Sequence, residues 1–205
     1  MRNGYKILDT DAHQMEPASI WADYIDEKFK DRAPRQGDLG NGERGILCEG
    51  EPITKQDGSY PMHSEEFLEA ARKAMERFGR ARGQGFSPAS RLEDMEEEGV
   101  DAQVIYPTVG GQILGKPFED PELLHAVCRA YNDWSLEYCA TDATRLRMAA
   151  MLPIQAPDLA VEEVKRVVDK GAACFYIRPN PVQGRNLYHE DYDPLWSAIE
   201  ASGKP

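Results

Sequence analysis

The sequence lacks any apolar run long enough to cross a bilayer, which takes about 20 residues. Its longest stretch without a charged residue, residues 102–115, is interrupted by Pro107 and by a Gly-Gly pair. The opening residues MRNGYKILDTDAHQ contain no apolar core, so we expect no secretory signal peptide. These absences predict a cytoplasmic protein that does not bind membranes.

Cysteine is scarce, and its spacing excludes two classes of small domain. The four cysteines include no Cys-x-x-Cys pair, which argues against a zinc finger. Cys128 and Cys139 fall in one predicted helix, about 16 Å apart along its axis, which is too far for a disulfide. We therefore expect reduced thiols, as is usual in the cytoplasm.

Basic residues are outnumbered, since the chain has 24 Lys and Arg against 36 Asp and Glu, a formal net charge of −12. Nucleic-acid binding needs clustered positive charge to neutralise phosphates, so we expect no nucleic-acid partner. A basic run within residues 72–82 shares its predicted helix with glutamates, which is typical of a solvated face. The sequence also lacks a Gly-x-Ser-x-Gly elbow, and no Gly-x-Gly-x-x-Gly follows the first strand, so neither a serine hydrolase nor a Rossmann site is favoured.

Strand and helix patterns alternate along most of the chain. Strands are predicted at residues 5–10, 102–106, 146–152 and 173–177, and helices are predicted to begin at Pro17, Pro88, Pro121, Pro157 and Pro194. This alternation is typical of βαβ units and an α/β fold with a parallel sheet. Residues 36–61 are rich in Gly, Pro and Asp, with strand-like pieces at 45–48 and 52–55, and residues 63–80 are charged and helical. We interpret residues 36–85 as a small β/helical insertion after the first strand.

The first strand leads into a polar sequence, LDTDAHQMEP, that has the composition of a metal site. Asp11 and His13 are two residues apart, so on an extended backbone their side chains project from one face, which Asp9 shares. In α/β barrels the chemistry lies at the carboxyl ends of strands, and carboxylate and imidazole both bind divalent cations. The alternative interpretation is a polar turn in which an aspartate caps a helix.

Four segments together resemble a known family. They are LDTDAHQMEPASIW at the first strand, RLEDMEEEGVDAQVIYPTVG at residues 91–110, the stretch at residues 130–166, and YDPLWSAIEASGKP at residues 192–205. In this order they resemble the amidohydrolase-2 family, in the aminocarboxymuconate semialdehyde decarboxylase-like branch of the amidohydrolase superfamily. The resemblance implies a (β/α)8 TIM barrel with a metal at its mouth and hydrolase or non-oxidative decarboxylase chemistry.

The resemblance also implies a ligand set. Asp11 and His13 would be the first-strand metal ligands, in a D-x-H variant of the usual H-x-H motif. We expect one divalent ion, zinc first, with manganese or iron as candidates because of the harder oxygen ligand. The family's other ligands, a histidine after the fifth strand and an aspartate after the eighth, would lie beyond residue 205, because the segment SGKP stands where the fifth strand would begin.

Three further residues are candidates for substrate binding. Glu16 matches the family's Glu-Pro after the first-strand motif, although a glutamate there can equally cap the next helix. Arg178 follows the fourth strand and can bind a substrate carboxylate bidentately or pair with a neighbouring loop. His189 lies on the next loop, where it can transfer a proton near pH 7 or simply lie at the surface.

We therefore predict a metal-dependent enzyme with a small-molecule substrate, and we favour non-oxidative decarboxylation of a carboxylated ring or enol. The alternatives are a hydrolase that uses metal-activated water on a C–N or C–O bond, and a non-catalytic partner subunit with an incomplete metal site. Four strands form only the N-terminal portion of a barrel that usually takes about 250 residues. Because its edge strands lack partners, we expect either a portion of a longer protein or association with another barrel subunit, for example as a homo-oligomer.

Overall fold

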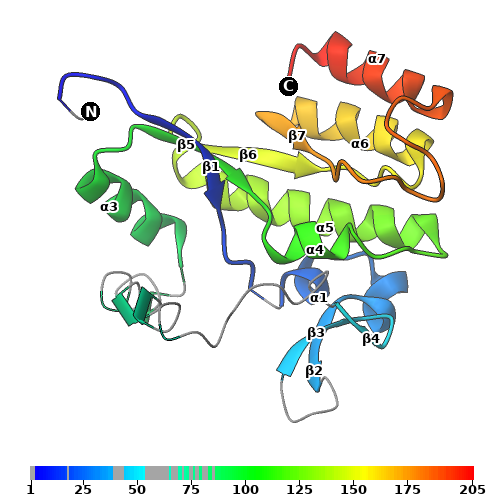
Figure 1. The fold of residues 1–205 in the computed structure, drawn as a ribbon, viewed down its shortest axis with the longest axis horizontal. Coiled ribbons are helices and arrows are strands. Elements are labelled where there is room, and N and C mark those ends of the chain that lie inside the picture. The colour runs from blue at the N-terminus through cyan, green and yellow to red at the C-terminus, as the bar shows by residue number, and fades with distance from the viewer. Residues whose placement is uncertain are drawn as a thin grey trace.

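A computed structural model of the chain describes residues 3–17, 19–38, 44–53, 65, 69–70, 72–73, 76, 79, 83–84 and 86–205. These residues form a parallel sheet in the order β1-β5-β6-β7 and a separate antiparallel sheet in the order β2-β3-β4 (Figure 1). The parallel sheet positions the site described below. Among the described residues, no helix is both long enough and apolar enough to cross a membrane.

The strands of the parallel sheet are β1 (Leu8–His13), β5 (Ala102–Tyr106), β6 (Leu146–Met151) and β7 (Cys174–Tyr176). The last three confirm the predicted strands to within a residue at each end. The first strand begins and ends later than predicted, because its pairing with β5 continues through the polar residues as far as His13, opposite Tyr106. Residues 11–13, which were expected to follow the first strand, are therefore part of that strand.

A bulge near the middle of β1 reverses the expected alternation of side chains. Asp9 lies opposite Gln103 of β5 and accepts a hydrogen bond from the Gln103 amide at 3.2 Å. Ala12 lies opposite Ile105, so β1 has one more residue than β5 between the two pairs. An extra residue moves the preceding side chains to the other face of the sheet. Asp9 therefore does not share a face with the predicted metal pair, and its expected place on that face is wrong.

Helices follow the strands as the sequence predicts. They are α1 (Ile20–Tyr24), η1 (Glu27–Arg32), α3 (Pro88–Glu98), α4 (Val109–Ile113), α5 (Pro121–Cys139), η2 (Ala140–Asp142), α6 (Pro157–Asp169), η3 (Glu190–Tyr192) and α7 (Asp193–Ser202). The Ser87 and Asp120 side chains cap α3 and α5 by accepting backbone N–H groups. Proline in the first turn and a left-handed Gly99 complete the boundaries of α3. The helix expected from Pro17 begins only at Ile20, and the short helix α4 was not predicted.

The longer helices cover one face of the sheet, and on the other face α4 packs against the end of β6, where Met151 is fully buried. Figure 1 shows α5 and α6 running behind β6 and β7, with α3 beside β1 and β5. Ile105, Leu146 and Met148 project from the strands into a buried cluster with Met95 of α3 and Val167 of α6. Each fully buried side chain of this size contributes roughly 1.5–3 kcal/mol. The opposite face is the one that carries His13.

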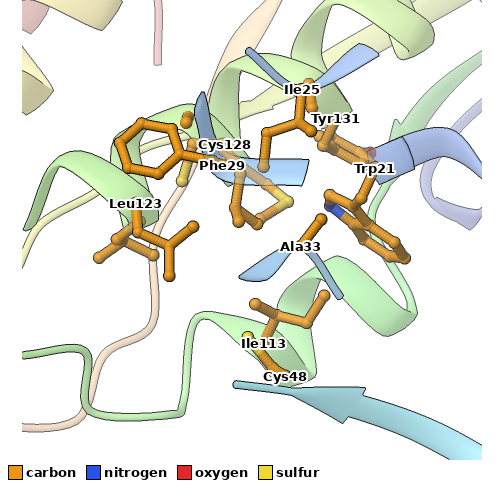
Figure 2. Close-up of a cluster of buried hydrophobic side chains, with 14 of the residues drawn as sticks. Trp21, Ile25, Phe29, Ala33, Cys48, Ile113, Leu123, Cys128 and Tyr131 are labelled. Carbon is orange, nitrogen blue, oxygen red and sulfur yellow. The ribbon is translucent and has the colours of Figure 1, made fainter. Parts of the chain in front are cut away.

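A second cluster joins α1 and η1 to α5 (Figure 2). Trp21, Phe29 and Tyr131 are its large members, and Cys48 of β3 packs into the same cluster. The antiparallel sheet consists of β2 (Arg35–Asp38), β3 (Arg44–Cys48) and β4 (Glu51–Pro52), of which the last two overlap the strand-like pieces predicted at 45–48 and 52–55. All four cysteines are buried and free.

The charged segment predicted to be helical at residues 63–80 is described only in part. Its described residues are helical, and Arg72 forms ion pairs with Glu69 at 2.9 Å and with Glu76. These are the i,i+3 and i,i+4 pairs expected of a solvated face. His63 and the other residues of this prediction lie outside the described residues, and the boundaries of the insertion, 36–85, stay a prediction.

Candidate active site

The carboxyl ends of β1, β5 and β7 border an open depression with a volume of about 620 Å³. Its lining consists of His13, Met15, Pro107, Thr108, Gly111, Gln112, Tyr176, Arg178 and Pro179. Catalytic and binding groups of α/β enzymes gather at this edge of the sheet. The depression is therefore the candidate active site.

Asp11 and His13 lie side by side at this edge, as the sequence predicts. The His13 Nε2 atom is 3.8 Å from Oδ1 of Asp11, and the two side chains are 51% and 91% exposed. The His13 Nδ1 atom is 3.0 Å from the carbonyl oxygen of Pro107. Because a carbonyl only accepts, this contact places a proton on Nδ1, and a ring with no second proton would present the lone pair of Nε2 beside the carboxylate.

This donor pair fits one side of a divalent-cation site. A histidine that binds a metal through one nitrogen typically donates its other N–H to a carbonyl or carboxylate, as His13 does to Pro107. The described residues contain no group of three or more His, Cys, Asp or Glu side chains that could hold a metal ion. Within the described part of the chain, Asp11 and His13 would thus supply two ligands and not a full set.

Glu16 is buried beneath the depression. It is 9% exposed, and its Oε1 accepts the N–H groups of Thr108 and Gly110 at 2.8 and 2.9 Å, while Oε2 accepts that of Val109 at 3.1 Å. Burial raises the pKa of Glu16, against the lowering effect of these backbone hydrogen bonds. Glu16 therefore caps α4, which follows β5, rather than the helix next to it in sequence.

Arg178 reaches the opposite side of the depression from the end of β7. Its Nη1 donates to the carbonyl of Gly111 at 3.1 Å, and its Nε donates to Oδ1 of Asn180 at 3.2 Å. The guanidinium also packs on Gly115, where a Cβ atom would lie 2.5 Å from Nη1. These contacts hold the positively charged guanidinium of Arg178 on the rim of the depression.

His189 occupies a different place. Its Nδ1 accepts the backbone N–H of Asp191 at 3.3 Å and lies 3.5 Å from Oδ1 of that residue, so it caps η3. The lining of the depression does not include it. In the described residues, His189 is thus separate from the pair on β1.

Tyr176 was missed by the sequence analysis. It lies in the depression with its ring 6.0 Å from that of Tyr106, which in turn is 6.1 Å from the His13 ring. A Cβ atom at Gly111 would lie 2.8 Å from the Tyr176 hydroxyl, so this glycine admits the tyrosine. The alternation of the strand ACFYI places Tyr176 on the face opposite Phe175, but only the packing of α4 brings it to the site.

A family model described as amidohydrolase, of the amidohydrolase-2 type, matches residues 9–205. The chain belongs to this family. The gamma-resorcylate decarboxylase of a Polaromonas strain is 26% identical over 121 residues, which are 56% of this chain and 36% of that protein. The family and its decarboxylase relatives are those that the sequence motifs indicated.

Solved amidohydrolase structures share the fold. An amidohydrolase from Mycobacterium avium subsp. paratuberculosis superposes with a TM-score of 0.73 and 22% identity, over 98% of this chain and 57% of that one. A dihydroxybenzoic acid decarboxylase from Polaromonas, with bound manganese and the inhibitor 2-nitroresorcinol, gives a TM-score of 0.56 and 18% identity, over 98% and 48%. The chain thus spans about half the length of these relatives, and its four parallel strands are part of a TIM barrel.

The carbonyl of Pro205 accepts a hydrogen bond from the backbone N–H of Phe175 in β7 at 2.9 Å. Residue 205 therefore lies against β7. Figure 1 shows this end of the chain beside β7.

Proposed function

We propose that this amidohydrolase contributes to a metal-dependent, non-oxidative decarboxylation of a small carboxylated ring. The observation that carries the proposal is the pairing of two opposite features in one depression. His13 lines one side of the depression and has the Asp11 carboxylate beside it, so this side offers lone-pair and anionic donors, and Arg178 offers a cation on the other side. A hydroxylated benzoate offers a carboxylate that can pair with the guanidinium and phenol oxygens that can bind a metal ion. The names of the decarboxylase relatives support the same substrate class.

Asp11 and His13 would hold the divalent ion. Manganese is the first metal to test because a relative was solved with it, and zinc and iron remain candidates for a carboxylate and an imidazole. When bound, such an ion withdraws charge from a coordinated oxygen of the substrate. The chain's own residues orient the substrate: Arg178 binds the carboxylate, and Tyr176 borders the ring.

Decarboxylation has a simple balance that makes it testable. The bond between ring carbon and carboxyl carbon breaks, carbon dioxide leaves, and a proton takes its place on the ring. With 2,6-dihydroxybenzoate in D₂O, we expect release of carbon dioxide and deuterium at the vacated carbon, both measured by mass spectrometry. Uptake of oxygen-18 from labelled water into the product of a C–N or C–O substrate would instead identify a hydrolase. If the chain forms neither product with manganese, zinc or iron, it does not have the proposed activity.

Replacing Arg178 with glutamine should weaken substrate binding more than turnover. The charged hydrogen bonds of a guanidinium to a carboxylate contribute about 1.5–3 kcal/mol each, so we expect KM to rise about 10–100-fold with a smaller change in kcat. Steady-state kinetics on the same substrate measures this. The control is Arg147→Gln, since Arg147 is exposed near the start of β6, and an equal effect of both variants would contradict the assignment.

A further inference from the structure

The turn at residues 107–111, which leads from β5 into the first residues of α4, connects the two sides of the depression. At its start, the Pro107 carbonyl accepts the Nδ1 proton of His13 at 3.0 Å. At its end, the Gly111 carbonyl accepts a guanidinium proton of Arg178 at 3.1 Å. The place of this backbone segment therefore determines the orientation of both side chains.

Glu16 holds the same turn from below. Its two carboxylate oxygens accept three consecutive backbone N–H groups, those of residues 108, 109 and 110, at 2.8–3.1 Å. The hydroxyl of Thr108 adds a hydrogen bond to the Gln14 carbonyl at 2.8 Å. The Gln14 amide in turn donates to Tyr131 and Ser135 of α5 at 2.8 and 2.9 Å. The segment that carries Glu16 is thus tied to the long helix behind the sheet.

We infer that Glu16 is a positioning residue that sets the orientation of His13 and Arg178 through the turn at residues 107–111. Both of its oxygens are engaged with backbone amides and it is buried, so it acts on the depression through this turn. Both Glu16 oxygens are needed as acceptors, because three adjacent backbone N–H groups converge on them and would otherwise lose their partner at a buried or partly buried site. What the site does with this arrangement rests on the proposed function, but the positioning role does not.

The test uses the His13 ring itself, in the full chain without metal. Nitrogen-15 NMR of the imidazole distinguishes a proton on Nδ1 from one on Nε2. We expect His13 of the wild type to carry the proton of its neutral ring on Nδ1. In Glu16→Gln, the side-chain NH₂ group faces one of the three backbone N–H groups, so a donor meets a donor. We therefore expect the His13 tautomer with its proton on Nε2 to become more populated. The backbone N–H of Val109 should also exchange about tenfold faster or more, as expected for the loss of a charged hydrogen bond.

Two further variants sharpen the test. Glu16→Asp keeps the charge but shortens the reach, so it should shift the His13 signature in the same direction. A wild-type result from Glu16→Asp would mean that charge alone matters and would overturn the inference. Glu122→Gln, at an exposed glutamate in the first turn of α5, should leave the signature unchanged.

The outcomes separate this inference from the proposed function. A wild-type His13 with its proton on Nε2 overturns the inference even if no Glu16 variant folds. An unchanged tautomer and unchanged exchange in folded Glu16→Gln overturn it as well. The expected shifts in a chain that releases no carbon dioxide would support the positioning role and reject the decarboxylase.

Discussion

Replacing His13 with alanine is expected to abolish metal binding and, with it, any metal-dependent turnover. The His13 ring is held by Pro107 with its Nε2 beside Asp11. Loss of a group that merely orients a ligand already costs 10–100-fold in metal affinity, so loss of the ligand should cost more than about 100-fold. Metal content after gel filtration and a manganese titration of the full chain measure the effect, and Asp11→Ala should act in the same direction.

The matched control is His189→Ala. His189 caps η3 and lies outside the depression, so its replacement should leave metal affinity within the error of the titration. A His13→Ala variant that retains wild-type metal content would reject the β1 pair as ligands. Equal losses in both histidine variants would point to a metal bound elsewhere.

The second large effect is expected at a buried carboxylate between α5 and α6. Glu163 is 0% exposed, and its carboxylate accepts hydrogen bonds from Arg166 at 2.7 and 2.8 Å and from Asn132 at 2.6 Å. The His125 Nε2 atom lies 3.5 Å from it. The Asn132 side chain also holds both the N–H and the carbonyl of Met151 at the end of β6. The cluster therefore joins two helices to the sheet.

Glu163→Ala should lower the free energy of unfolding by about 3 kcal/mol, the lower end of the range for a broken buried ion pair, because Arg166 loses two hydrogen bonds and Asn132 loses one while Arg166 keeps its ion pair with Asp133. Urea unfolding followed by circular dichroism measures the loss. The adjacent Glu162 is exposed on the same helix, so Glu162→Ala should change stability by no more than about 0.5 kcal/mol. Similar values for the two variants would show that the buried network does not stabilise the fold.

The same carboxylate predicts how acid affects stability. Burial acts to raise the pKa of Glu163, but hydrogen bonds from Arg166 and Asn132, with the His125 ring nearby, outweigh it, so the pKa lies below its ordinary value of 4.5. A lowered pKa in the folded state means that the unfolded chain binds the proton more tightly. The contribution of Glu163 is thus complete above pH 4.5 and is lost as the pH falls through the folded-state pKa. The difference in stability between wild type and Glu163→Gln should shrink over that interval.

Local patterns determined most of the secondary structure. Ser87 and Asp120, each followed by proline, predict helix starts because a side-chain acceptor and a ring without an N–H suit the first turn, and both capped helices begin there. The apolar runs of β5, β6 and β7 identify buried parallel strands. The proximity of Asp11 and His13 was also readable from their spacing of two, because the bulge that moves Asp9 to the other face leaves these two side chains next to each other.

Contacts between distant segments decided the rest. The bulge in β1 arises from pairing with a strand more than ninety positions later in the sequence, and that pairing placed Asp9 with Gln103. Glu163 looks like an ordinary surface glutamate in the sequence, because nothing local shows that side chains of another helix will surround it. Glu16 was a candidate for substrate binding or a helix cap, but nothing local shows that the backbone amides of a distant turn will surround it. A buried charge needs partners, and those partners are chosen by the tertiary fold. The sequence by itself therefore determined most of the elements, the family resemblance and the proximity of Asp11 and His13, whereas the tertiary structure decided what holds these two residues in place.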